Sequence, residues 1–240
     1  PTRLRTVDAA ALESAHRAEP VAAGAAAREL VGCGTSPQRQ SVRIVNPDTG
    51  TVLPEGAVGE IWVTGPSVAG GYWNRPEESR ATFRVRLADD PVGTPHLRTG
   101  DLGFLSDGEL YITGRLKDVL IIRGRNHYPQ DIEATAEGCH PALQPAASAA
   151  LVVDHDGIER LVLLHEVRRQ QAAAPDLTAI AAAVRQAVTR RHGLHVATLA
   201  LLRPGDLPRT TSGKVRRQEC RERLLAGTLP LLAHDAHGAP

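Results

Sequence analysis

The tripeptide Thr99-Gly100-Asp101 places a carboxylate at the mouth of an expected β-hairpin. A carboxylate at the end of a strand accepts hydrogen bonds from two neighbouring hydroxyls at once, and the diol of a ribose offers such a pair. The alternative is a plain turn, because Asp and Gly are both common turn residues. Asp101 is therefore a candidate nucleotide-binding residue.

Two further polar segments follow within thirty residues of Asp101. Arg115, Lys117 and Asp118 lie between two apolar runs, where a solvated sheet edge is the alternative to a binding role. The segment from Arg123 to Pro129 is polar, aromatic and contains a glycine, as a loop that lines a ligand would be. A simple connection from a strand to a helix has the same composition.

The segment 208–214 offers three hydroxyl side chains, a glycine and a lysine, Lys214. It differs from the phosphate-binding G-x-x-x-x-G-K-[ST] loop, because Val215 follows the lysine and no glycine stands at the first position. The pattern favours a mobile loop that carries one ammonium group toward a reacting phosphate or carboxylate.

Lysine is scarce in this chain: of its 28 basic residues, all but Lys117 and Lys214 are arginines. A lysine ammonium is compact and its donors rotate, so a planar guanidinium does not replace it. Both lysines are therefore candidates for a specific role. The alternative is that two lysines escaped a general drift toward arginine.

The elements that must position these residues divide into two kinds. Up to residue 117 we expect antiparallel β-hairpins: strands near 41–45 and 58–65, a short helix from Pro76, and a hairpin around Asp107-Gly108. Residues 1–40 are rich in alanine and interrupted by Pro and Gly, so we expect them to be loosely ordered, with at most one short helix near 8–17.

From residue 118 to 240 the pattern predicts a smaller α+β domain. The expected elements are a strand at 119–122, a helix from Pro129, a strand pair that turns at His155-Asp156-Gly157, a helix from 177 to 192, a strand at 196–202 and a basic helix from 215. Asp176 and Gly193 are the expected caps of the long helix. Residues 227–240 are expected to fray.

Composition narrows the class of protein. The chain has 240 residues, is 42% hydrophobic and carries a net charge of +1, which is typical of a globular protein without a field that attracts nucleic acid. It has no apolar run of about 18 residues, so we expect no membrane span and a cytoplasmic location.

The three cysteines form no CxxC pair, so we expect no metal site and read them as buried or incidental thiols. Because methionine is absent and the chain begins at Pro1, we expect it to be part of a longer polypeptide.

Four segments, in this order, resemble motifs of the adenylate-forming enzymes, which include acyl-CoA synthetases, luciferases and the adenylation domains of peptide synthetases. They read GEIWVTGPSVAGGYWNRPEESRATF, LRTGDLGFL, GRLKDVLIIRGRNHYPQDIE and LPRTTSGKVRR. The segment RGRNHYPQDIE and the opening RTVDAAALE with LVGCG are most similar to the fatty acyl-AMP ligases. The resemblance implies the β-rich end of a large N-terminal domain followed by a small α+β C-terminal domain.

The resemblance also implies roles for individual residues. Asp101 would bind the ribose hydroxyls of ATP with help from Arg115, Lys117 and Asp118 would form the hinge between the two domains, and Lys214 would be the catalytic lysine. The loop that admits a phosphopantetheine arm would consist of Arg123, Gly124, Arg125, Asn126 and His127.

The implied activity is ATP- and Mg²⁺-dependent activation of a fatty acid and its transfer to an acyl carrier protein. The phosphate loop and the metal ligands are expected upstream of residue 1, so we expect these residues alone to be inactive. The alternatives are a fragment of an acyl-CoA synthetase and a non-catalytic module that docks a carrier protein.

A basic helix near the end of the chain offers a surface for an acidic carrier. Its arginines are Arg216, Arg217, Arg221 and Arg223. Electrostatic complementarity of this kind guides docking. The alternative is an ordinary solvated helix.

Overall fold

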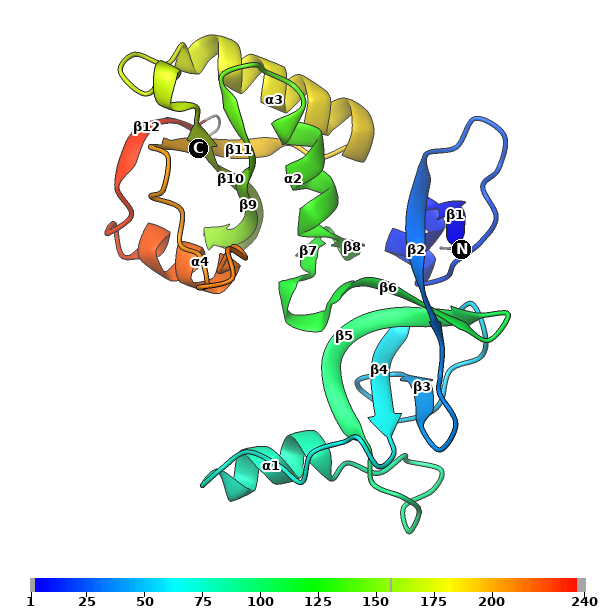
Figure 1. Ribbon diagram of the computed structural model, residues 1–240. Coiled ribbons are helices and arrows are strands. Elements are labelled where there is room, and N and C mark those ends of the chain that lie inside the picture. Colours follow the sequence, from blue (N-terminus) through cyan, green and yellow to red (C-terminus); the bar gives the residue numbers. More distant parts are fainter. Residues whose placement is uncertain (1–2, 156, 237–240) are drawn as a thin grey trace. The chain divides into compact units, whose positions relative to one another are not determined.

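The computed structural model describes residues 3–155 and 157–236 and divides the chain into two compact units, Pro1–Val119 and Leu120–Pro240 (Figure 1). The division lies close to the boundary at 117/118 that the sequence predicts. The assignment of these units to the end of a large domain and to a small mobile domain remains a prediction. The overall class, mixed α and β with antiparallel sheets, agrees with the α+β expectation.

Unit 1 is built on a six-stranded sheet in the order β1-β2-β6-β5-β4-β3, with every neighbouring pair antiparallel. The strands are β1 (Leu4–Asp8), β2 (Ala27–Thr35), β3 (Ser41–Val45), β4 (Gly59–Thr64), β5 (Leu97–Ser106) and β6 (Glu109–Arg115). Phe104 and Tyr111 stack in its core with ring centroids 5.2 Å apart.

The hairpin of β5 and β6 forms as the sequence predicts. Asp107 and Gly108 both have positive φ, 52° and 74°, as a two-residue type I′ turn requires. The turn sets Ser106 opposite Glu109 and, further along, Asp101 opposite Arg115. Helix α1 (Pro76–Phe83) begins with the expected proline in its first turn.

The expectation of a loosely ordered segment 1–40 is wrong for the residues that the structure describes. β1 and β2 pair with each other, β2 pairs with β6, and a single π-helical turn spans Ala11–Ala15. Only Val7, Leu12 and Leu30 of this segment are buried apolar side chains. With so few inward positions the segment shows little period-two signal, and pairing with a distant strand determines its structure.

Unit 2 is built on a four-stranded sheet in the order β12-β11-β10-β9. The strands are β9 (Leu143–His155), β10 (Ile158–Val167), β11 (Val196–Leu202) and β12 (Leu231–Ala236). β10 and β11 are parallel, whereas the other two pairs are antiparallel. The predicted turn between β9 and β10 includes Asp156, which lies outside the described residues.

Helices cover both faces of this sheet (Figure 1). Helices α2 (Pro129–Glu137) and α3 (Leu177–His192) pack on one face, and α4 (Arg217–Leu225) packs on the other. Asp176 caps α3 by accepting a hydrogen bond from the backbone N–H of Ala179, and Gly193 ends the helix with φ 65°. Both caps are those that the sequence predicts.

The end of the described chain is ordered, contrary to the expected frayed tail at 227–240. β12 pairs with β11, and Asp235 accepts a hydrogen bond from Arg185 at 2.5 Å. Residues 237–240 of the expected tail lie outside the described residues. β12 is a short strand at the edge of the sheet and pairs only with β11. A short edge strand shows only a weak alternation of apolar and polar residues, so the sequence pattern does not reveal it.

The three cysteines differ in exposure. Cys33 is exposed, Cys139 is half-buried and Cys220 is buried on the side of α4 that faces the sheet, where burial raises its thiol pKa to about 11. Among residues 3–155 and 157–236, no helix is long and apolar enough to cross a membrane.

Candidate functional site

Asp101 and Arg115 form an ion pair across β5 and β6. Arg115 Nε donates to Asp101 Oδ1 at 2.9 Å, and this hydrogen bond together with the charge of Asp101 raises the pKa of Arg115. The Asp101 side chain is 32% exposed. Within the described part of the chain its second oxygen, Oδ2, accepts no hydrogen bond, so it remains open to a hydroxyl donor from a ligand.

A bulge of three residues in β5 orients Asp101. Glu60 of β4 pairs with Leu102 and Trp62 pairs with Arg98, so the segment 99–101 lies opposite a single residue. Gly100 has φ 72° there, a conformation that favours glycine. Bulges redirect side chains at the edges of sites, and the structure shows Asp101 in such a bulge rather than in a hairpin turn.

Hydrogen bonds hold the bulge closed. The Thr99 hydroxyl donates to the carbonyl of Ile61 at 2.7 Å and accepts from the N–H of Asp101 at 3.1 Å. The N–H of Gly100 donates to Glu60 Oε1 at 3.1 Å. The backbone on both sides of Gly100 is therefore fixed.

Glu60, which the sequence analysis did not select, is the buried centre of this arrangement. Its side chain is 2% exposed, and Oε2 accepts hydrogen bonds from Trp62 Nε1 at 2.9 Å and from Arg98 Nε at 2.8 Å. Arg98 Nη2 lies 2.7 Å from the same oxygen. The sequence did contain a signal for Glu60. In GEIWV this acid stands inside a continuous apolar run, and such a run is typical of a strand buried on both faces.

Lys117 and Asp118 lie in a short 3₁₀ turn, η2 (Leu116–Asp118), directly after β6. Lys117 is exposed. The turn is the last element of unit 1 before the division after Val119. Its position suits a hinge, and the hinge role of both residues remains a prediction.

The expected loop 123–129 is in fact a tight hairpin. β7 (Leu120–Ile122) and β8 (Arg125–His127) are joined by Arg123 and Gly124, both with positive φ. The N–H of Arg123 donates to Glu159 Oε2 at 3.1 Å. Arg123, Gly124 and Arg125 are exposed, whereas His127 is buried, and their predicted contact with a pantetheine arm remains untested.

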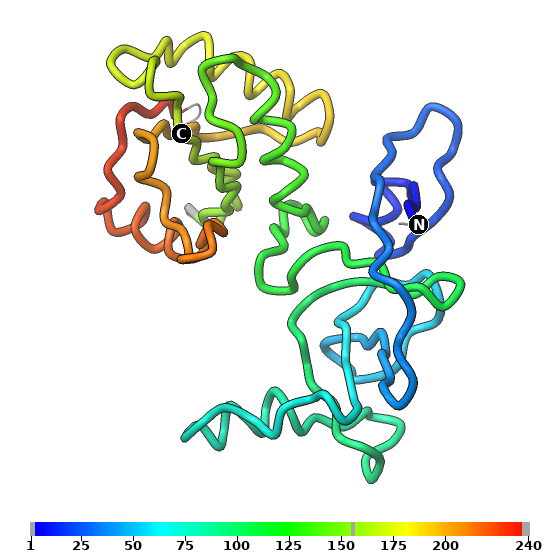
Figure 2. Tube along the Cα trace, viewed as in Figure 1, coloured from blue at the N-terminus to red at the C-terminus, as the bar shows by residue number. Residues whose placement is uncertain are grey.

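Lys214 stands at the end of a small closed loop in unit 2, the orange segment before α4 in Figure 2. Arg209 and Val215 form an antiparallel bridge that closes the loop. Lys214 is exposed, and within residues 3–155 and 157–236 its ammonium has no ion-pair partner. The group is thus available to an external anion.

A buried carboxylate fixes the base of this loop. Glu166 of β10 is 4% exposed, and its Oε1 accepts hydrogen bonds from the N–H groups of Gly205 and Leu207, both at 2.9 Å. The segment that leads to Lys214 therefore starts from a defined point on the sheet.

The arginines expected to form a basic face on α4 have partners within unit 2. Arg217 makes a two-pronged pair with Glu133 of α2, with Nε to Oε1 at 2.7 Å and Nη2 to Oε2 at 2.6 Å. Arg216 and Arg223 pair with Glu219, and Arg221 donates to a carbonyl of β9. Two acids, Glu133 and Glu219, offset part of the charge of these four arginines, and a basic docking surface on α4 stays a prediction.

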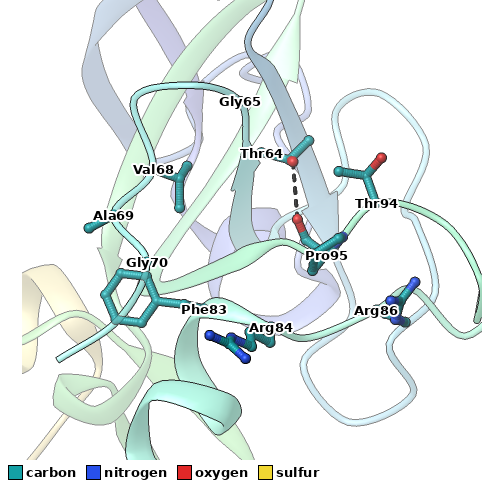
Figure 3. Close-up of a pocket in the computed structure, with 10 residues that line it drawn as sticks. All are labelled: Thr64, Gly65, Val68, Ala69, Gly70, Phe83, Arg84, Arg86, Thr94 and Pro95. Carbon is teal, nitrogen blue, oxygen red and sulfur yellow. Dashed lines mark hydrogen bonds between the residues drawn. The ribbon is translucent and has the colours of Figure 1, made fainter. Parts of the chain in front are cut away.

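An open pocket of about 500 Å³ lies beside the start of β5 in unit 1 (Figure 3). Its lining combines apolar side chains such as Val68 and Phe83 with two arginines, Arg84 and Arg86. None of the predicted site residues lines it. The pocket is therefore separate from the Asp101–Arg115 pair.

Two family models match the chain. One is described as an AMP-binding enzyme and matches residues 14–73, and the other is the AMP domain of Disco-interacting protein 2-like proteins and matches residues 117–234.

Similar proteins carry related names. A medium-chain-fatty-acid–[acyl-carrier-protein] ligase, JamA, of Moorena producens is 50% identical over 202 residues, which is 84% of this chain and 34% of JamA. A long-chain-fatty-acid–AMP ligase, FadD26, of Mycobacterium marinum is 44% identical over 92% of this chain and 39% of its own length. The chain thus spans little more than a third of these relatives.

A solved structure agrees with these matches. It comes from structural and functional studies of fatty acyl-adenylate ligases from E. coli and L. pneumophila. It superposes with a TM-score of 0.77 at 33% identity and covers 94% of this chain and 38% of that chain.

We predict that Glu60→Ala destabilises unit 1 by about 3 kcal/mol, because it leaves the guanidinium of Arg98 and two N–H donors without their acceptor. Glu60→Gln keeps an acceptor but loses the charge and falls between Ala and the unchanged chain. Urea unfolding of the 240-residue chain, followed by tryptophan fluorescence, measures this because Trp62 and Trp73 both lie in unit 1. Glu77→Gln, an exposed acid in α1, is the control and changes stability by less than about 1 kcal/mol. Equal losses at both positions contradict the central role of Glu60.

Proposed function

This chain belongs to the AMP-binding, adenylate-forming enzymes, and from that membership we propose that it is the C-terminal part of a fatty acyl-AMP ligase. The observation that carries the proposal is the Asp101–Arg115 pair on the six-stranded sheet of unit 1, with one carboxylate oxygen open to a ligand. The ligase names of the relatives support the fatty acid as the substrate class.

The proposed reaction has two steps. A carboxylate oxygen of the fatty acid attacks the α-phosphorus of ATP, the bond to the β-phosphate breaks, and pyrophosphate leaves with its electron pair. The thiol of a phosphopantetheine then attacks the acyl carbon, the bond to AMP breaks, and the thiol proton passes to solvent. The products are a thioester and AMP.

The residues of this chain act through charge and hydrogen bonding. Asp101 accepts hydrogen bonds from the ribose hydroxyls through Oδ2, while the hydrogen bond from Arg115 to Oδ1 orients the carboxylate. Lys214 supplies an ammonium that stabilises the negative charge that develops during attack on the α-phosphate. Both roles come from the family resemblance, and the exposure of the two groups supports them.

ATP is the proposed co-substrate, and Mg²⁺ accompanies it in adenylate-forming enzymes. Among the residues that the structure describes, no group of three or more His, Cys, Asp or Glu side chains is arranged to hold a metal ion. A cytoplasmic location remains a prediction from the sequence.

The proposed acceptor is the phosphopantetheine of an acyl carrier protein. The name of JamA supports it, since that protein is a ligase for an acyl carrier protein. Transfer to free CoA, as in an acyl-CoA synthetase, is the second candidate, because several relatives are named putative fatty-acid–CoA ligases.

We predict that the 240-residue chain alone forms no acyl-adenylate, because it contains no phosphate loop of the G-x-x-x-x-G-K-[ST] type or of the family's Ser/Thr/Gly-rich type. Pyrophosphate release from ATP and a fatty acid measures this and is expected at background. Sustained turnover by the isolated chain contradicts the proposal.

In the full-length protein, we predict that Lys214→Ala slows adenylation by about two to four orders of magnitude, as expected for loss of a charge at the reacting centre. Lys214→Arg restores little, because a planar guanidinium does not reproduce the compact ammonium. Transfer from supplied acyl-adenylate to the acceptor is expected to stay within about twofold of the unchanged protein, because the chemistry at phosphorus is already complete. Equal losses in both steps argue against the role.

We predict that the full-length protein transfers the acyl group to a carrier protein at least about tenfold faster than to CoA at equal concentration, a difference of about 1.4 kcal/mol. Both acceptors present the same thiol arm, so the discrimination must come from groups beyond it. Thioester formation with each acceptor, followed by mass spectrometry, measures the two rates. Equal rates would move the assignment to an acyl-CoA synthetase.

A further inference from the structure

The guanidinium of Arg209 connects the Lys214 loop to the sheet of unit 2. Its Nη1 donates to the carbonyl of Gly213 at 2.9 Å, and its Nη2 donates to the carbonyl of Ala146 at 2.7 Å. Gly213 immediately precedes Lys214, whereas Ala146 belongs to β9. One side chain thus joins the residue before the ammonium to a distant strand.

The strand end of this connection is itself fixed. His165 of β10 pairs with Ser148 and Val167 pairs with Leu143, so the segment 144–147 bulges out of β9 opposite Glu166. Ala146 has φ 52° in this bulge, a conformation that non-glycine residues rarely adopt. The buried residues that follow, from Ala147 onward, anchor the bulge to the core.

Within the loop, Thr210 organises the other side of the turn. Its N–H donates to the carbonyl of Lys214 at 2.8 Å, and its hydroxyl accepts from the N–H of Lys214 at 3.0 Å. The N–H of Gly213 donates to the carbonyl of Thr210 at 2.9 Å. These bonds shape the turn, but among the hydrogen bonds and ion pairs of residues 3–155 and 157–236 only those of Arg209 connect the segment 210–214 to the sheet.

We propose that Arg209 is a positioning residue, which holds the backbone of Lys214 in place for adenylate formation. The proposal rests on the proposed function, in which Lys214 acts at the reacting phosphate. An exposed loop that contains glycine loses conformational entropy whenever it must adopt one shape, and a restraint present beforehand removes part of that cost. Geometry of the reacting groups strongly affects rate, so a loosened loop lowers it.

Arginine suits this position better than lysine. The two carbonyls belong to segments 67 residues apart in sequence, Ala146 and Gly213, and they accept from two different nitrogens of one rigid fork. A single ammonium on a flexible stem does not hold both acceptors in one geometry. We therefore expect Arg209→Lys to replace Arg209 only in part.

The first test uses the full-length protein and measures both half-reactions. Arg209→Ala is expected to slow adenylation about tenfold and to leave transfer from supplied acyl-adenylate unchanged, with Arg209→Lys between Ala and the unchanged protein. Arg203→Ala is the matched control. Arg203 is an exposed arginine directly after β11, and its side chain makes no hydrogen bond or ion pair within the part of the chain that the structure describes, so both rates are expected to stay unchanged.

A double-mutant cycle with Lys214→Ala then separates positioning from direct contact with the substrate. If Arg209 acts through Lys214, adding Arg209→Ala to Lys214→Ala causes no further loss of adenylation. A full tenfold further loss shows that Arg209 acts on the substrate itself and overturns the proposal.

The second test is independent of catalysis and uses the 240-residue chain. Hydrogen exchange of the Gly213 and Lys214 amides is expected to become about tenfold faster in Arg209→Ala, while the amides of β10 keep their rates. Unchanged exchange in the loop overturns the proposal even if activity falls.

The two hypotheses fail in different ways. If Lys214→Ala leaves adenylation intact, the proposed function is wrong and the role of Arg209 in catalysis falls with it. If Lys214→Ala abolishes adenylation but Arg209→Ala changes neither rate nor exchange, only the inference about Arg209 is wrong.

Discussion

The buried carboxylate of Glu60 is the interaction on which the candidate site of unit 1 depends. A carboxylate removed from water is stable only when its oxygens are matched by donors, and here the donors come from Trp62, Arg98 and the backbone of Gly100. One of these donors lies in the bulge that presents Asp101. The stability of the buried charge therefore depends on the geometry of the site. Any movement of the bulge removes the Gly100 N–H from Glu60 and leaves the carboxylate short of a donor.

Unit 2 uses the same principle twice. Glu133 joins α2 to α4 through Arg217 and also accepts from the N–H of Ala150, while Glu166 holds the start of the Lys214 loop through two backbone N–H groups. In each case a buried acid on a regular element fixes a segment that is itself polar and exposed. Such segments have little apolar surface of their own to bury, so hydrogen bonds to charged groups, which are stronger than neutral ones, must define their shape.

Local signals predicted much of this fold, and long-range pairing accounts for what they missed. The Asp107-Gly108 turn, the Pro76 and Pro129 helix starts and the caps of α3 are each set by residues within one turn of chain. β1, β2 and β12 are edge or weakly buried strands whose partners lie far away in sequence, so period-two patterns do not reveal them. Arg209 and the distant partners of Glu60 were missed for the same reason, although the acid inside the apolar run GEIWV was a local signal for Glu60 itself. The importance of both residues lies in partners up to 63 residues distant, and no spacing rule connects those positions.

Several arginines of this chain are held by acceptors within the fold, whereas its two lysines are exposed. This difference explains why the position of the Lys214 backbone matters. Arg98, Arg185, Arg209 and Arg217 bridge two acceptors or pair with buried acids, work that a forked donor does well. Lys117 and Lys214 are exposed instead. In bulk water two unit charges about 4 Å apart interact by only about 1 kcal/mol, and the same pair gains several-fold where water is excluded. An exposed ammonium therefore stabilises a reacting phosphate only when it is delivered to a drier site at close range. Because its four-carbon stem is flexible, that delivery depends on the backbone from which the stem extends.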